Sequence, residues 1–335
     1  MRAPQPVQTI TTLFQSNTKL TRAMTDRLVR VLDGHSAAVH AVCMTHDGAY
    51  CMTASADRTI KLWNPHKTDS NKPSITNKDP ALCVQTYSGA HGYAVLDLAI
   101  TQDKAQFASV GEDKTAFVWD VASMRVLRRI PAHNHRINAV AYNKHDTVLY
   151  TASYDGSVKC WDLRAQHLRD PIQSMTDFKD SVTSLAQTEY SIIAGSVDGY
   201  VRIYDMRRGL MQADYLHDPI TSVITSPDAR SYLASIMTSK LRLVSIEAGK
   251  LLKEYAGHVH QSYKVEAGFE SDDQHVLSGS EDGSLYHYSL LTGQLAYVTR
   301  QAHYKEISSV SCHPSSPMFI TASYDGLGKV WMKEI

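Results

Sequence analysis

Histidine, serine and aspartate recur together at one spacing in this chain of 335 residues. In each set the serine follows the histidine by 20 residues, and the aspartate follows the serine by two. The three sets are His35/Ser55/Asp57, His133/Ser153/Asp155 and His303/Ser323/Asp325. These residue types could form a hydrolase triad, in which a histidine takes the proton of a serine nucleophile. An enzyme needs one activated nucleophile, so three equivalent sets favour a structural role and a non-catalytic protein.

A tryptophan six residues after each aspartate extends the sets: Trp63, Trp161 and Trp331. We interpret each group of four as a buried hydrogen-bond chain, or tetrad, in which the serine hydroxyl bridges the histidine and the indole N–H. Such a network stabilises a core when every member has a partner. A fourth copy, His91/Asp113/Trp119, has Gly111 in the place of the serine. We therefore expect the fourth chain to be incomplete.

The elements that must position these residues are short strands. Residues 132–164 contain three runs of alternating apolar residues, separated by polar turns at 143–146 and 153–156. This period of two is typical of β-strands. The pattern predicts a repeating unit of strands in which the histidine opens the unit and the tryptophan closes it.

The repeating unit returns along the whole chain. Weaker copies contain Asp198 with Tyr204 and Asp282 with Tyr288, and one degenerate copy has Thr238 and Val244 in the two slots. The seven turn positions, at 57, 113, 155, 198, 238, 282 and 325, are 56, 42, 43, 40, 44 and 43 residues apart. A period of 40–45 residues is typical of WD repeats, so we predict an all-β, seven-bladed propeller. The degenerate fifth blade should be the least stable.

The two ends of the chain complement each other. The last repeat ends four residues after Trp331, too soon for a fourth strand, while 28–32 is an alternating strand before the first repeat. We expect this N-terminal strand to close the ring, since closure removes open sheet edges. The predicted organisation is a disordered tail at 1–26 and a propeller at 27–335 with a polar loop insertion at 66–80. Met1 and Met24 both remain possible starts.

Composition argues against several classes of function. The 34 basic and 34 acidic residues cancel, so we expect no membrane surface and no direct sequence-specific contact with nucleic acid. The five cysteines contain no C-x-x-C pair, which favours free thiols in a reducing compartment. The histidine pairs at 133/135 and 258/260 have no nearby residue to complete a metal site. No phosphate-binding glycine motif occurs, so we predict neither metal nor cofactor.

Binding should therefore occur on the loops at the ends of the propeller, because its inner strands are buried between blades. Residues just before the turn aspartates should face one end of the ring: Glu112, Tyr154, Glu281 and Tyr324, with Ala56, Val197 and Met237. Residues three positions after the repeat histidine should border the same end: Arg136, Gln261 and Glu306. Exposed tyrosines are preferred interface anchors, so this end is predicted to bind a protein or peptide.

The opposite end offers an alternative. Trp161-Asp162-Leu163-Arg164 is a W-D-x-R sequence, as in substrate receptors of cullin-type ubiquitin ligases, and 204–207 is similar. A simpler interpretation is that Arg164 caps its own turn.

Several longer segments resemble one family more closely than the general repeat. They are YCMTASADRTIKLWNP (50–65), TYSGAHGYAVLD (86–97), WDVAS (119–123), IIAGSVDGYVRIYDMRRG (192–209) and AGKLLKEYAGHVHQSYKV (248–265). They resemble the mitogen-activated protein kinase organizer family of spliceosome-associated WD-repeat scaffolds. The resemblance covers residues 27–335. The chain departs from the family pattern in its tail, in the 66–80 insertion and at Ala90.

The resemblance implies a non-catalytic scaffold in pre-mRNA splicing complexes and in a MAP-kinase cascade. The implied partners are splicing factors and kinase-cascade proteins, and the implied location is the nucleus and cytoplasm. We expect a monomeric subunit of a larger assembly. The ubiquitin-ligase receptor remains the alternative function.

Overall fold

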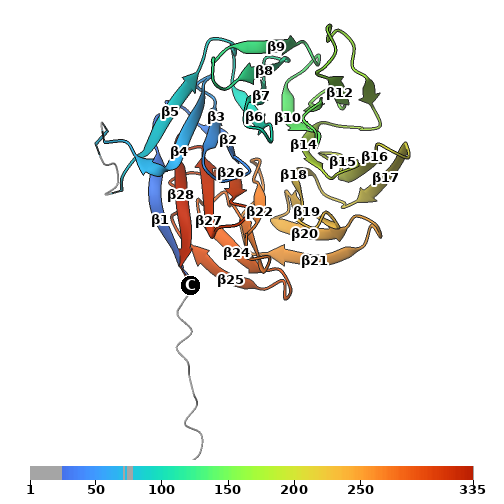
Figure 1. Ribbon diagram of the computed structural model, residues 1–335. Coiled ribbons are helices and arrows are strands. Elements are labelled where there is room, and N and C mark those ends of the chain that lie inside the picture. The colour runs from blue at the N-terminus through green and yellow to red at the C-terminus, as the bar shows by residue number, and fades with distance from the viewer. Residues whose placement is uncertain (1–24, 71, 74–77, 335) are drawn as a thin grey trace, which may run out of the picture.

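The computed structural model describes residues 25–70, 72–73 and 78–334. These residues form seven four-stranded antiparallel sheets arranged as the blades of a ring, which confirms the predicted propeller (Figure 1). No helix occurs among the described residues. Consistent with this, the described part of the chain contains no helix that is long and apolar enough to cross a membrane.

Each of the first three blades runs outward from its inner strand in chain order. Blade 1 contains β2 (Val39–Met44), β3 (Cys51–Ser55), β4 (Ile60–Thr68) and β5 (Ala81–Tyr87). Blade 2 contains β6 (Val95–Ile100), β7 (Gln106–Gly111), β8 (Ala116–Asp120) and β9 (Val126–Ile130). Blade 3 contains β10 (Ile137–Tyr142), β11 (Val148–Ser153), β12 (Val158–Asp162) and β13 (Gln173–Met175).

The remaining four blades follow the same plan until the chain returns to its start. Blade 4 contains β14 (Val182–Gln187), β15 (Ser191–Ser196), β16 (Tyr200–Asp205) and β17 (Leu210–Tyr215). Blade 5 contains β18 (Ile220–Thr225), β19 (Ser231–Ile236), β20 (Lys240–Ser245) and β21 (Leu251–Ala256). Blade 6 contains β22 (Ala267–Phe269), β23 (His275–Ser278), β24 (Leu285–Ser289) and β25 (Leu295–Thr299). Blade 7 contains β26 (Ile307–Cys312), β27 (Met318–Ser323), β28 (Gly328–Glu334) and β1 (Thr25–Leu32).

The hydrophobic core lies between the blades. One cluster joins Trp63 and Val39 of blade 1 to Ile320 and Val330 of blade 7, and six further clusters fill the spaces around the ring. The second strand of a blade, such as β3, is buried on both faces because a neighbouring sheet covers each face. The outer strand is more accessible, and in β17 every residue is exposed or half-buried. Each blade is therefore stable only within the closed ring.

Strand β1 closes the ring, as predicted. It pairs antiparallel with β28, from Thr25 opposite Glu334 to Leu32 opposite Gly328. The strand begins at least three residues earlier than the predicted start at Leu28, so the predicted tail at 1–26 is wrong for its last two residues. The side chain of Asp26 is fully buried, against the prediction of disorder. The rest of the predicted tail, residues 1–24, lies outside the described residues.

The insertion in blade 1 is shorter than the predicted 66–80 loop. Strand β4 continues to Thr68, and β5 begins at Ala81. The described ends of the insertion contact the closing strand: the Val31 amide donates to the Asp79 carbonyl over 3.3 Å, and Arg30 donates to Thr68 over 3.3 Å. Part of the loop is therefore an extension of the sheet that supports β1.

Candidate functional site: the mouth of the central channel

A cavity of about 610 Å³ opens at one end of the ring. All seven blades contribute to its walls, so it must lie on the axis of the propeller. We call it the channel mouth and define it by its lining residues: His40, Leu96, Glu112, Arg136, Asn138, Tyr154, Asp180, Ser181, Thr183, Val197, Thr221, Met237, Ser262, Tyr263, Lys264, Ser308 and Tyr324. Its volume is in the range of a ligand or peptide side-chain site.

A recurring backbone irregularity builds this wall. In six of the seven blades the register of the inner strand shifts after its first residue, as in a β-bulge. A bulge leaves one residue unpaired and redirects its side chain. The residues at the shift are His40, Leu96, Asn138, Thr183, Thr221 and Ser308, and all six line the channel mouth. The bulges thus turn one side chain in each of these six blades toward the axis.

Tyr154 and Arg136 form a preorganised pair at the edge of the mouth. The guanidinium of Arg136 lies 4.8 Å from the centre of the Tyr154 ring, which is the geometry of a cation–π contact. Tyr154 is 50% exposed, and Arg136 is exposed. The pair therefore presents a rigid aromatic side chain with a charged group to a partner.

Tyr324 occupies the opposite wall and is less exposed than we predicted. Its ring packs edge-on against His40, with ring centres 5.4 Å apart, and lies 5.3 Å from Tyr263. Only part of its surface faces the channel mouth. Tyr324 therefore supports the wall and offers a smaller contact area than Tyr154.

A charged group of residues lies at the floor of the mouth. The ammonium of Lys264 is 2.7 Å from the carboxylate of Glu266, which also accepts a hydrogen bond from Ser309. Burial raises the pKa of Asp97 to about 6. Burial alone would lower the pKa of Lys264, but Glu266 and Asp97 outweigh it and hold that pKa above its usual range. Lys264 thus stays charged beside its two acidic neighbours.

The structure brings together most of the residues predicted to border this end. Tyr154, Tyr324, Glu112 and Arg136, with Val197 and Met237, line one cavity. Glu281, Gln261 and Glu306 are not part of its lining, and neither is Ala56. Glu281 has a structural role instead, because one of its carboxylate oxygens accepts the backbone N–H groups of residues 261–263 over 2.6–2.9 Å. Glu281 shapes the loop that carries Tyr263.

The sequence reasoning missed eleven of the residues that line the mouth, among them His40, Asp180, Tyr263 and Lys264. They are not at the predicted repeat positions, so the alignment of repeats does not select them. His40 could have been found because it is a polar residue within an otherwise apolar strand. The recurring bulge explains why a polar residue is tolerated at this position.

The tetrads are present, but the bridging hydroxyl is not the serine that we predicted. In blade 3, Thr151 lies 2.9 Å from His133 Nε2 and accepts the Trp161 indole N–H over 3.1 Å, while His133 Nδ1 is 3.0 Å from Asp155. Burial lowers the pKa of His133 and so favours its neutral form, in which Nδ1–H donates to Asp155 and Nε2 accepts from the Thr151 hydroxyl, while the hydroxyl oxygen accepts the indole N–H. Thr53 and Thr321 take the same place in blades 1 and 7.

The predicted serines tie the turns together. Ser153 donates to the Arg136 carbonyl over 2.9 Å and accepts the Asp155 amide over 3.1 Å. Ser55 and Ser323 make the corresponding contacts, so these serines are not members of the tetrads. The error has a simple reason: residues two apart on a strand point to the same face, so both hydroxyls fit the pattern.

Blade 2 also contradicts the expectation of an incomplete chain. Ser109 bridges His91 Nε2 at 2.7 Å and the Trp119 indole at 2.8 Å, and His91 Nδ1 contacts Asp113. Gly111 occupies the position of the turn serine, so its lack of a hydroxyl leaves the chain intact. Four blades therefore have complete tetrads.

The tetrads have the hydrogen-bond connectivity of a catalytic triad, but their hydroxyl groups are not accessible to a substrate. The bridging hydroxyls of Ser109, Thr151 and Thr321 belong to fully buried residues. Each hydroxyl also accepts an indole N–H, and none of the three residues lines the channel mouth. Burial lowers the pKa of His133 despite the opposing effect of Asp155. The geometry is that of a neutral, fully bonded core network.

The W-D-x-R turn lies at the other end of blade 3. Strand β12 separates it from the turn that carries Tyr154, so the two surfaces are about 16 Å apart. Both oxygens of Asp162 accept from the guanidinium of Arg164 over 2.9 Å, and the Arg164 amide donates to Asp162 as well. Arg164 caps its own turn, and Trp161 is buried in the core.

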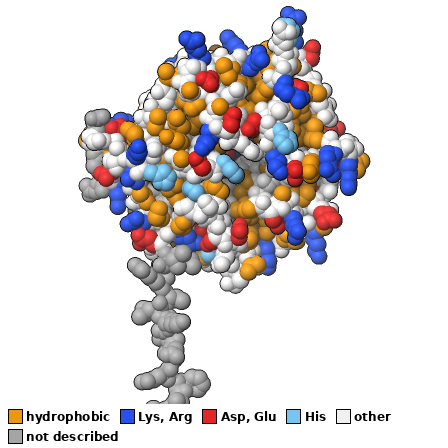
Figure 2. Space-filling model, viewed as in Figure 1, with side chains coloured by type: hydrophobic (Ala, Val, Ile, Leu, Met, Phe, Trp, Pro, Cys, Tyr) orange, Lys and Arg blue, Asp and Glu red, His pale blue; other side chains and the backbone are white. Residues whose placement is uncertain are grey.

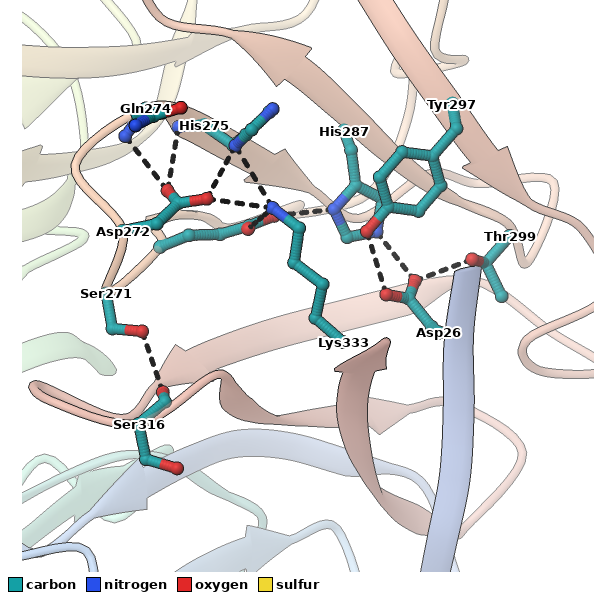
Figure 3. Close-up of polar contacts among 11 residues, drawn as sticks. Asp26, Ser271, Asp272, Gln274, His275, His287, Tyr297, Thr299, Ser316 and Lys333 are labelled. Carbon is teal, nitrogen blue, oxygen red and sulfur yellow. Dashed lines mark hydrogen bonds and ion pairs between the residues drawn. The ribbon is translucent and has the colours of Figure 1, made fainter. Parts of the chain in front are cut away.

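One group of described residues has metal-ligand chemistry: Glu270, Asp272 and His275. Figure 3 shows the Lys333 ammonium beside Asp272 and His275. Its Nζ atom is 2.6 Å from Glu270, 2.9 Å from Asp272 and 3.0 Å from His275 Nδ1. A lysine cation therefore occupies the place that a metal ion would take, and the group fits an internal salt bridge better than a metal site.

Comparison with known proteins supports the repeat assignment. The WD domain, G-beta repeat model matches residues 26–64, 249–289 and 295–332, and the N-terminal domain model of nucleolar protein 10-like proteins matches residues 92–266. Proteins called WD repeat domain-containing protein 83 are similar over nearly the whole chain. The human protein is 37% identical over 306 residues, which is 91% of this chain and 92% of that protein.

The chain belongs to the WD repeat domain-containing protein 83 family.

Other members of the family are similarly distant. The Xenopus laevis protein is 41% identical over 305 residues, covering 91% of this chain and 92% of that protein. The Dictyostelium discoideum homologue of WD repeat domain-containing protein 83 is 34% identical over 331 residues, covering 90% of this chain and 97% of that protein. The family and the propeller together support a scaffold for protein interactions.

Proposed function

We propose that this protein is a non-catalytic scaffold that assembles splicing factors, and in addition MAP-kinase-cascade proteins, through its channel mouth. We choose this surface because all seven blades contribute to one cavity, and because its walls contain preorganised aromatic and charged side chains. The partner classes come from the family resemblance of the segments in the sequence. Location in both the nucleus and the cytoplasm belongs to the same proposal.

The chemistry of the mouth suits a peptide segment. Its walls carry both signs of charge: Glu112 and Asp180 are acidic, and Arg136 and Lys264 are basic. Figure 2 likewise shows acidic and basic side chains interspersed over the face in view. Binding to bare RNA requires an excess of positive charge, so any RNA in such a complex is contacted mainly by partner proteins.

An affinity purification with mass spectrometry tests this proposal. The test variant combines Arg136→Ala, Tyr154→Ala and Tyr324→Ala, and it must melt within a few degrees of the wild type. We expect loss of the splicing and kinase-cascade partners, since aromatic and arginine anchors carry much of the energy of interfaces. Recovery of the same partners at wild-type levels would show that another surface binds them.

The matched control is Tyr304→Ala. Tyr304 is 82% exposed and follows the repeat histidine of blade 7, but it is not among the residues that line the channel mouth. This variant should retain the partners. Equal loss of partners in the control and the triple variant would contradict a specific role for the mouth.

The ubiquitin-ligase receptor is tested in the same experiment. If the wild type recovers a cullin adaptor and no splicing or kinase proteins, and Arg164→Ala abolishes that recovery, the alternative function is correct. The structure does not favour it, because the Arg164 guanidinium is engaged by its own turn aspartate.

A further inference from the structure

Strand β1 makes a second, buried connection that its pairing with β28 does not require. The carboxylate of Asp26 enters blade 6 and meets three side chains there: His287 Nε2 at 2.7 Å, Tyr297 Oη at 2.9 Å and Thr299 Oγ1 at 2.6 Å. Figure 3 shows Asp26 facing these residues. The first described residues of the chain, at the start of β1, thus join blade 7 to blade 6.

The hydrogen-bond geometry determines the charge of His287. Its Nε2 atom contacts Asp26, and its Nδ1 atom lies 2.5 Å from Glu270 Oε1. The pKa values of Asp26 and Glu270 are lowered, which favours their ionised forms, and ionised carboxylate oxygens can only accept, so both ring nitrogens donate. Only the imidazolium form has two N–H groups. His287 therefore carries a positive charge, unlike the tetrad histidines, whose second nitrogen accepts from a hydroxyl.

Charge balance leads to the same conclusion. Asp26 and Glu270 are two buried negative charges, with side chains 0% and 7% exposed. Lys333, 4% exposed, lies 2.6 Å from Glu270 and 2.9 Å from the partly exposed Asp272, so two carboxylates share its one positive charge. A buried unpaired charge is strongly destabilising, so the second positive charge must come from His287, which is fully buried. Burial alone would lower the pKa of His287, but Asp26 and Glu270 outweigh it and raise that pKa.

We propose that Asp26 and the imidazolium of His287 form a proton-dependent latch, which holds the closing strand against blade 6 and releases it when His287 loses its second proton. Release would free the first residues of β1 from blade 6 and leave the strand held by its backbone pairing to β28, by Leu32 in the core and by its contacts with the blade 1 insertion. The edge of blade 7 would then open more readily than any other blade edge. The latch makes closure of the ring sensitive to alkaline pH.

The direction of the pH dependence follows from linkage. A histidine whose pKa is raised on folding stabilises the protein fully below its unfolded pKa of about 6.5, and this contribution is lost as pH rises through the folded pKa. The pKa values of Asp26 and Glu270 are lowered, so their contribution is lost only in acid. Other titratable groups that face the cluster are Asp272, His275, Tyr297, Lys333 and Cys312. Burial raises the pKa of Cys312 and the pKa of Tyr297, so neither side chain titrates near neutral pH.

The first test is an NMR titration of the His287 ring in the wild-type protein. We expect a midpoint above 6.5 and signals of two protonated ring nitrogens at pH 7. A midpoint at or below 6.5 would overturn the latch. This measurement needs no variant, so it decides the proposal even if substitutions at Asp26 prevent folding.

The second test is Asp26→Asn, which keeps the shape of the side chain and removes its charge. We expect a melting temperature about 5–15 °C lower near pH 7, a lower His287 pKa, and faster amide hydrogen exchange in β1 and β28 than in blades 2–4. The difference in melting temperature should shrink as pH rises through the wild-type midpoint. A constant difference across that pH range, or unchanged exchange in β1, would contradict a proton-dependent latch.

Arg27→Ala is the matched control on the same strand. Arg27 forms an exposed pair with Glu334, with side chains 58% and 45% exposed, and it does not contact the cluster. We expect wild-type exchange in β1 and a wild-type midpoint for His287. A response equal to that of Asp26→Asn would assign the effect to the strand pairing, and the latch would be wrong.

Discussion

Blades 3 and 6 use the same residue type in opposite ways. In blade 3, His133 lies between a hydroxyl and a carboxylate, so it is neutral and burial lowers its pKa. In blade 6, His287 lies between two carboxylates, so it is charged and its pKa is raised. The partner of the second ring nitrogen decides the charge of a buried histidine. Burial alone does not determine this charge.

Blade 6 also shows what happens when the repeat pattern is incomplete. Tyr288 stands in the tryptophan slot, and its hydroxyl lies 3.0 Å from His258 Nδ1. His258 Nε2 and His260 Nδ1 are buried without a hydrogen-bond partner among the described residues. Buried polar groups without partners are costly. The tetrad blades therefore gain stability from satisfied polar groups that blade 6 lacks.

The largest effect is expected for Trp161→Ala in blade 3. This change creates a core cavity and removes the donor to Thr151, so it should lower the free energy of unfolding by about 3–5 kcal/mol. Val244→Ala, in the corresponding slot of blade 5, should cost less because fewer buried atoms are lost and no donor is removed. Chemical denaturation of both variants checks this order. Equal losses would show that the tetrad adds nothing beyond packing.

The bridging hydroxyl of Thr151 can be compared directly with the turn hydroxyl of Ser153. Thr151→Val keeps the shape of the side chain but leaves the Trp161 indole and His133 without their partner, at a cost of about 1–3 kcal/mol. Ser153→Ala removes only the turn contacts and should cost about 0.5–1.5 kcal/mol. Denaturation midpoints of the two variants, measured side by side, test the assignment. A larger loss for Ser153→Ala would restore the serine as the bridging residue.

The tetrad histidines should make the stability of the protein sensitive to acid. Burial lowers the pKa values of His91, His133 and His303, so these residues take up a proton on unfolding below about pH 6.5. Stability should therefore fall as pH drops from 7 to 5.5. His133→Gln cannot titrate and should show a shallower dependence, although it is less stable at pH 7. Thermal melts across this range provide the measurement, and an unchanged slope would be inconsistent with a neutral tetrad histidine.

The smallest effect is expected for Arg164→Ala. The Arg164 guanidinium is 71% exposed and pairs with the aspartate of its own turn. Solvent screening weakens such pairs, so the melting temperature should stay within experimental error of the wild type. A clear loss of stability would mean that this turn supports the blade more than its exposure suggests.

The repeat spacing was sufficient to predict the fold and the closure of the ring. Seven turns at a nearly constant period require seven equivalent units, and the missing last strand of blade 7 could only come from the other end. Tyr154 and Arg136 were also predictable, because they occupy fixed positions relative to the turn and the repeat histidine. These features depend on local patterns that each repeat carries.

Only the tertiary structure decided which groups meet across the ring. Asp26 and His287 are 261 residues apart in the chain, and no repeat relates them. The choice between Thr151 and Ser153 required the position of the indole, since both hydroxyls lie on one face of the strand. The same holds for Lys264, which interacts with Asp97 of blade 2, and for Glu266, which accepts a hydrogen bond from Ser309 of blade 7. Local pattern determines strands and turns, whereas charge states and long-range partners depend on how the closed ring places distant side chains together.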